Sequence, residues 1–166
     1  MDDLSQRLAS AASELESLRG EVVAGEPWPL SDAYGAEPES EWGPKEVLAH
    51  VAEMLPYWFG QIEAILAAAP PPADPPPFGR VATDGARFER IGSDRRLPGG
   101  ELFDRIAAAA TDAAARTEAL TPAELERRGV HVRVGELNVG AIIERFALSH
   151  LEEHVVQLRE IVARPR

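Results

Sequence analysis

The sequence predicts an all-α fold, a four-helix bundle with one long Pro-rich crossover. Three observations lead to this prediction. Apolar residues recur at steps of three and four along four long segments, which is the period of an amphipathic helix. No series of alternating segments could build a sheet. Residues 70–79, "PPPADPPPFG", suit neither a helix nor a central strand, so we expect a stiff, extended connector between the second and third helices.

Length, composition and charge narrow the class of protein. The 166 residues, 45% hydrophobic and 27% charged, suit one domain over residues 1–166 with a sizeable core. The N-terminus is acidic and polar, and no apolar run approaches the roughly 20 residues that span a bilayer, so we expect a cytoplasmic protein. The net charge of -11 makes nucleic acid and anionic membrane unexpected partners, which leaves a small-molecule substrate.

The first two helices are predicted from an apolar stripe and from helix-start signals. The first covers residues 2–25, and its stripe consists of Leu4, Leu8, Ala11, Leu15, Leu18 and Val22. The second begins at Pro44, because the missing N–H of proline costs nothing at the first helical position. It continues to residue 69. Pro56 lies inside this helix and is expected to kink it or to force a local repair.

The third and fourth helices follow the crossover. Residues 99–120 form the third, with a short helix possible before it from Thr83. After the third helix, Thr121, Pro122 and Glu124 match a capping box that opens a short turn. Residues 129–138 are predicted to be a loop or a short strand. Asn138 can cap the last helix, residues 139–163.

Three of the chain's four histidines fall on inward helix faces. His150 and His154 are four residues apart on the last helix, so two imidazoles there can chelate one ion. On the second helix His50 lies among Val47, Val51 and Met54, again inward. The chain has no cysteine, so any metal must be held by nitrogen and oxygen ligands. Three imidazoles with an open fourth position suit zinc, nickel, copper or iron. Hydrogen-bonded core histidines without a metal remain the alternative.

The motif H-x-x-E-H at residues 150–154 is also a metalloprotease signature, with Glu153 as the general base. That interpretation needs a third protein ligand well downstream. The residues after His154 are typical of the end of the same helix, and Glu160 points away from the histidine pair. We therefore expect Glu152 and Glu153 to be solvated rather than catalytic.

Two stretches resemble a known family. The residues "WGPKEVLAHVAEMLPYWFGQIEAIL" place a tryptophan and a proline before an inward histidine. The residues "GVHVRVGELNVGAIIERFALSHLEEHVVQLREI" carry a loop and then a helix with H-x-x-x-H followed by glutamine. In this order, over nearly the whole chain, they resemble the DinB/YfiT-like superfamily of metalloenzymes. The resemblance implies His50, His150 and His154 as a metal triad for zinc, nickel or a similar divalent ion.

The resemblance also implies functions. Family members with a known role are similar to S-transferases and isomerases that use a small thiol, bacillithiol or mycothiol. The family tends to form dimers through its helices, and the alanine-rich face "IAAAATDAAA" would permit a homodimer. The expected function is a divalent-metal-dependent enzyme, with a thiol-dependent S-transferase or isomerase as the specific form. A non-catalytic ligand-binding or stress-response bundle, a metal-dependent hydrolase and an acidic interaction protein remain alternatives.

Further residues are candidates for the wall of a binding pocket. Tyr57 and Trp58 follow His50 by two turns, so one of them should face the same groove. His131 lies in the loop before the last helix and could reach the mouth of the site. Arg145 could meet an anionic substrate. Glu53, one turn from His50, could orient a ligand, but we expect it to be solvated.

Overall fold

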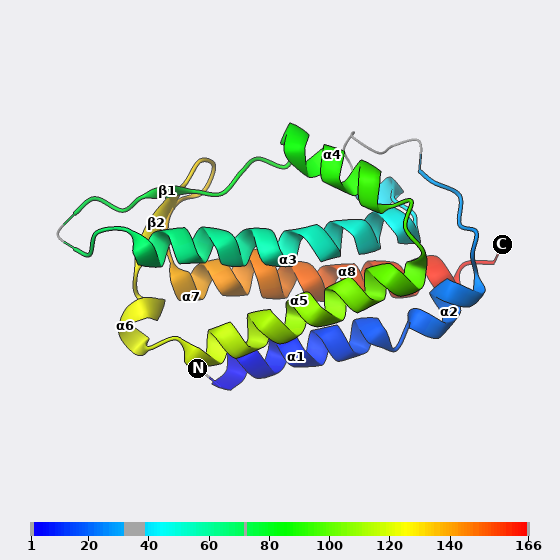
Figure 1. Cartoon of the computed structure of the whole chain (residues 1–166), viewed down its shortest axis with the longest axis horizontal. Helices are drawn as coiled ribbons and strands as arrows, with labels where there is room; N and C mark the ends of the chain where they lie inside the picture. The colour runs from blue at the N-terminus through cyan, green and yellow to red at the C-terminus, as the bar shows by residue number, and fades with distance from the viewer. Residues whose placement is uncertain (1, 32–38, 72, 166) are drawn as a thin grey trace.

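The computed structural model describes residues 2–31, 39–71 and 73–165. Its long helices lie side by side in a bundle (Figure 1). They are α1 (Asp2–Glu16), α3 (Pro44–Ala67), α5 (Gly99–Ala119) and α8 (Ser149–Ala163). Helix α5 packs between α1 and α3, and α8 also contacts both α1 and α3. The predicted four-helix bundle is confirmed.

The direction of the helices explains the long crossover. Helices α1 and α8 run one way along the bundle, and α3 and α5 run the other way (Figure 1). Because α3 and α5 are parallel neighbours, the chain must return over the length of the bundle between them. The returning segment includes the Pro-rich stretch, the strand β1 (Pro77–Phe78) and the helix α4 (Gly85–Asp94).

A small sheet covers one part of the bundle. Strands β2 (Arg128–His131) and β3 (Gly135–Asn138) form an antiparallel hairpin, and β1 pairs parallel to β2. Within the described ranges the sheet has the order β1-β2-β3. The proline in β1 is tolerated because β1 is an edge strand. Residues 129–138, predicted to be a loop or a short strand, therefore lie in a hairpin of two short strands, and β2 pairs with a proline-rich segment that sequence patterns did not assign to a sheet.

The first predicted helix is divided in two, which corrects its continuous assignment. Helix α1 ends at Glu16 and α2 (Arg19–Ala24) follows. At the break the Leu18 N–H donates to the Leu15 carbonyl at 3.0 Å, an i to i−3 bond that tightens the turn. The apolar stripe survives, since the side chains of Leu8, Leu15 and Val22 are fully buried.

The last predicted helix is also not uniform. It comprises α7 (Val139–Ile142), a π-helical segment η2 (Ile143–Leu148) and then α8. Asn138 caps α7 as predicted, because its side chain accepts a hydrogen bond from the Ala141 N–H at 2.8 Å. A π-helical turn holds more residues than an α-helical turn, so it rotates the following helix relative to the preceding one. The segment ends two residues before His150.

The other start and stop signals have mixed outcomes. The capping box at Thr121 and Glu124 is present and opens α6 (Pro122–Leu125). Helix α4 is capped by Asp84 rather than Thr83. Helix α3 continues through Pro56, which lies on its exposed side. A short 3-10 helix η1 (Glu39–Glu41) precedes α3.

Among the helices that the structure describes, none combines the length and apolar character needed to cross a bilayer.

Candidate metal centre

Three histidine rings meet between α3 and α8. His50 on α3 and His154 on α8 are buried, and His150 on α8 is partly exposed. The Nε2 atoms of His50 and His150 are 3.1 Å apart. The ring centroid of His154 lies 4.9 Å from that of His50 and 4.7 Å from that of His150. The structure therefore brings together the three residues that the sequence marked as a metal triad.

Glu39 adds a carboxylate to this cluster. Its Oε2 lies 3.9 Å from His150 Nε2 and 3.8 Å from His154 Nε2. One potential ligand atom from each of the four residues lies within 4.8 Å of the others. Sequence reasoning missed Glu39 because it lies on η1, outside the long helices, where no helical spacing relates it to a histidine.

Glu53 fixes the orientation of His50. Its Oε1 lies 3.1 Å from His50 Nδ1, and its side chain is 6% exposed, so the expectation that Glu53 is solvated was wrong. Arg80 Nη2 donates to both carboxylate oxygens, at 2.5 and 2.8 Å. Burial raises the pKa of Glu53, and the hydrogen bond from Arg80 opposes that shift. A carboxylate on Nδ1 keeps the proton on that atom, so the lone pair of His50 is on Nε2, which faces His150 Nε2.

Gln157 fixes His154 in the same way. Its Oε1 lies 2.8 Å from His154 Nδ1, and its Nε2 donates to the Glu39 carbonyl at 2.9 Å. An amide oxygen can only accept, so Nδ1 of His154 carries the proton and Nε2 has the lone pair. The Gln157 side chain therefore links the backbone of Glu39 to the ring of His154.

Arg87 holds the Glu39 carboxylate from the other side. Its Nη2 forms an ion pair with Glu39 Oε1, and its Nη1 donates to the Ala82 carbonyl at 2.8 Å. The first turn of α4 positions Arg87, because Asp84 Oδ1 accepts a hydrogen bond from the Arg87 N–H at 3.0 Å. The crossover thus supplies both arginines that orient the carboxylates of the cluster.

The histidines are neutral at physiological pH. Burial lowers the pKa of His150 to about 3, and the nearby His154 and Arg87 add to the shift. Burial also lowers the pKa of His50, well below its usual value, and the pKa of His154. Neutral imidazole is the form that binds metals.

The donor set fits a divalent ion. Two nitrogens bound at about 2.0–2.1 Å to one tetrahedral ion lie roughly 3.3 Å apart, close to the spacing of His50 and His150. His154 Nε2 is buried and has no hydrogen-bond partner within the described residues. A buried nitrogen lone pair without a donor is costly unless a cation satisfies it. Imidazole donors suit zinc, copper, iron and nickel alike.

A cavity of about 440 Å³ lies against the cluster. His50, His150 and Glu39 form part of its wall, together with the pocket candidates Trp58 and His131. The cavity is also lined by Arg80, Val81, Ala82, Thr83, Arg87, Arg133 and Phe146. The histidine cluster therefore opens into a space of the size that small ligands occupy.

The other two pocket candidates lie outside the cavity wall. The ring of Tyr57 stacks under Arg80, whose guanidinium carbon is 3.8 Å from the ring centroid. Burial raises the pKa of Tyr57. Arg145 is exposed, with its guanidinium carbon 5.6 Å from the ring centroid of Phe146. Both residues contact a lining residue rather than the cavity.

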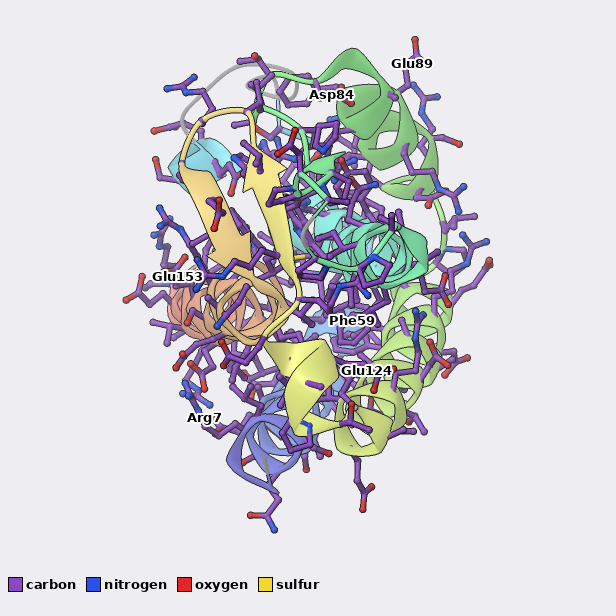
Figure 2. The ribbon with its side chains drawn as sticks, turned by 90° about the vertical axis from the view of Figure 1, so that its left-hand side faces the viewer. Arg7, Phe59, Asp84, Glu89, Glu124 and Glu153 are labelled. Carbon is purple, nitrogen blue, oxygen red and sulfur yellow. The ribbon has the colours of Figure 1, made fainter. Side chains whose placement is uncertain are left out.

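The protease interpretation finds no support in the position of its general base. Figure 2 shows Glu153 on the outside of α8, with its side chain pointing away from the bundle. The side chain is exposed, as the sequence predicted. Glu152 faces α1, where Arg7 pairs with it at 3.1 Å.

The chain is thus a helical bundle with a long crossover and an internal histidine and glutamate cluster that could hold a metal ion. The family model of the DinB superfamily matches residues 4–158. The chain belongs to the DinB superfamily. Neither the curated proteins nor the solved structures contain a significant match to it.

Proposed function

We propose that this chain is a divalent-metal-dependent enzyme. His50, His150 and His154 would hold zinc or nickel, and the adjoining cavity would receive a small-molecule substrate. The observation that carries the proposal is the convergence of three imidazoles, two of which, His50 and His150, form part of the wall of a cavity. A bound divalent ion would act as a Lewis acid that lowers the pKa of a thiol or water placed beside it.

The surrounding residues would orient the site and handle a proton. Glu53 and Gln157 hold the two buried imidazoles through Nδ1, so their Nε2 atoms keep a fixed direction. Arg87 binds one oxygen of Glu39 and leaves Oε2 directed toward the histidines. Glu39 Oε2 is therefore placed to accept a proton from a thiol or water that enters the cavity.

The specific reaction that we propose is S-transfer or isomerisation with a small thiol such as mycothiol or bacillithiol. Two facts support it: the chain belongs to the DinB superfamily, and it has no cysteine of its own. Thiol chemistry here would need a thiol cofactor. Metal-dependent hydrolysis is the second candidate, and the carboxylate of Glu39 beside the histidines favours it, because a carboxylate can act as a general base toward water.

The test uses protein purified without an affinity tag and loaded with zinc or nickel. We expect conjugation of mycothiol or bacillithiol to monochlorobimane above the uncatalysed rate, and its loss after chelation. Glu153→Gln is a control variant that should keep the activity, because Glu153 lies on α8 with His150 and His154 but is exposed. Hydrolysis of a p-nitrophenyl ester without thiol would favour the second candidate. If wild-type protein still holds well below one equivalent of metal after incubation with excess zinc or nickel, both candidate functions are refuted.

A further inference from the structure

We propose that the cavity beside the histidine cluster selects a small carboxylate with an apolar, unsaturated body, and that Arg133 recognises the carboxylate. The inference rests on the proposed function, since it treats this cavity as the substrate site. It concerns a different part of the wall from the metal ligands. Its support comes from charge, from ion pairing and from the rings in the wall.

The charge of the cavity wall is opposite to that of the protein. The chain carries a net charge of -11. The cavity is nevertheless lined by Arg80, Arg87 and Arg133, and among the described residues Glu39 is the acidic group in its wall. Positive charge inside a cavity of an acidic protein raises the local concentration of small anions. A neutral or cationic ligand would gain nothing from this arrangement.

Two of these arginines already have carboxylate partners. Arg80 binds both oxygens of Glu53 and stacks on the ring of Tyr57. Arg87 is 5% exposed and pairs with Glu39. Their guanidinium groups are committed to orienting the histidine cluster, so neither is the group that a substrate carboxylate would meet first.

Arg133 differs from them. It lies on the turn between β2 and β3, and its backbone N–H donates to His131 Nδ1 at 3.1 Å, which anchors the turn. Its side chain is exposed and lines the cavity. Across residues 2–31, 39–71 and 73–165 no carboxylate forms an ion pair with it. A guanidinium with free N–H groups at a cavity wall can bind a carboxylate through two parallel hydrogen bonds.

Aromatic rings form the neighbouring part of the wall. The rings of Trp58 and Phe146 stack with centroids 4.4 Å apart and an interplanar angle of 18°. The rings of Phe146 and His131 stack at 5.0 Å and 24°. The His131 ring fits here because Gly79 has no side chain, as a Cβ on Gly79 would lie 2.2 Å from it. Aromatic walls bind flat, unsaturated groups by stacking and by burial of apolar area.

The His131 ring adds a hydrogen-bond donor to this wall. Its Nδ1 accepts from the Arg133 N–H, so in the neutral ring the proton is on Nε2. In the described part of the chain no acceptor meets the distance and angle of a hydrogen bond to that buried Nε2. Burial lowers the pKa of His131, although the backbone of Arg80 is near enough to oppose that shift. A donor beside the aromatic stack and next to Arg133 favours a ligand that carries acceptor oxygens. A cavity of about 440 Å³ suits a molecule of a few to about twenty heavy atoms.

The test compares three probes, benzoate, benzamide and acetate, by ligand-observed NMR titration of metal-free protein. Benzamide has the shape of benzoate without the charge, and acetate has the charge without the ring. We expect benzoate to bind about 10-fold tighter than either probe, because each lacks one of the two contacts. The preference for benzoate over benzamide should decrease as salt is added.

Variants locate the contact. Arg133→Gln should weaken benzoate about 5- to 10-fold and benzamide less than about 2-fold. Arg128→Gln is the matched control, because Arg128 is exposed on the same hairpin but pairs with Glu136 at 2.7 Å and does not line the cavity. It should leave both probes within about 2-fold. Arg133→Lys keeps the charge without the two-pronged geometry and should recover part of the loss.

The outcomes separate this inference from the metal proposal. Equal binding of benzoate and benzamide, or no difference between Arg133→Gln and Arg128→Gln, would overturn the inference. Benzoate preference that needs added zinc and survives Arg133→Gln would overturn it too, because the ion would then bind the carboxylate. If the protein binds no zinc but Arg133-dependent preference for benzoate persists, the inference stands and the metal proposal fails.

Discussion

Helix α3 carries two buried polar clusters one turn apart, and they differ in how far their hydrogen bonds are satisfied. The Glu46 side chain is fully buried. It accepts from the Ser31 N–H at 2.9 Å, from the Gly43 N–H at 3.1 Å and from Arg95 Nη1 at 2.9 Å. One turn later, His50 faces His150 through two Nε2 atoms, and within the described residues His154 Nε2 has no partner.

This difference indicates that the Glu46 cluster is structural. Glu46 has donors from the backbone and from an arginine, so nothing more can bind there without displacing them. It joins the loop before α3 to the segment after α4. In the histidine cluster the Nδ1 atoms of His50 and His154 are hydrogen-bonded, and within the described residues the buried Nε2 of His154 has no partner, which costs stability unless a cation is bound. The first cluster holds the chain together, and the second is arranged for a ligand.

The largest effect on folding is expected from Glu46→Gln. Neutralising this carboxylate removes the buried negative charge with which Arg95 pairs, so the metal-free protein should lose about 3 kcal/mol of unfolding free energy. Urea unfolding measures the loss. Glu63→Gln, on the same helix but 67% exposed at the side chain, should change stability by less than about 0.5 kcal/mol. Zinc stoichiometry of folded Glu46→Gln should equal that of wild type, and a loss of zinc would break the comparison.

His154→Ala should give the opposite pattern. Zinc at about 100 times its dissociation constant should stabilise wild-type protein by roughly 2.7 kcal/mol, and chelation should remove this gain. The variant should show none of it, because one of three nitrogen ligands is gone. Its metal-free form should lose less stability than Glu46→Gln, since the hydrogen bond that it loses, from His154 Nδ1 to Gln157, joins two neutral groups. Urea unfolding with zinc and with EDTA checks both statements, and equal stabilisation by zinc in both proteins would contradict them.

The parts that sequence predicted well are those set by local periodicity. The stripe of Leu8, Leu15 and Val22 predicted a helix face, and Asn138 predicted a helix start, because each depends on neighbours a turn away. The meeting of His150 and His154 follows from their spacing on one helix. The break after Glu16 and the π-helical segment were not predictable in this way, because packing against other helices decides between nearly equal helical forms.

The parts that sequence missed are tertiary. Glu39 reaches the histidines from η1, a position that only the folded chain brings near α8. Glu53 is typical of a solvated helix residue by its local pattern, and it is buried because the crossover places Arg80 over it. A single charged residue gives no sign of a partner 27 positions away.

Glu53→Gln tests whether Glu53 orients His50 in the histidine cluster. A glutamine keeps the shape but provides a weaker acceptor for His50 Nδ1–H, and a neutral one beside Arg80. Zinc affinity should fall toward the upper end of the roughly 10- to 100-fold range for residues that orient metal-binding histidines. Competition with a chromophoric chelator measures it. Exposed Glu153→Gln should leave the affinity unchanged, and equal losses in the two variants would contradict an orienting role for Glu53.

The smallest effect is expected from Gln157→Leu. Leucine has a similar size but cannot accept from His154 Nδ1 or donate to the Glu39 carbonyl. Both lost hydrogen bonds join neutral groups, so zinc affinity should fall about 10-fold, at the lower end of the range for residues that orient metal-binding histidines. The same chelator competition gives the value. Because Gln157 acts on His154 and Glu39 alike, Glu39→Gln combined with Gln157→Leu should lose less than the sum of the two single losses. Additive losses would show that Gln157 does not link His154 to Glu39.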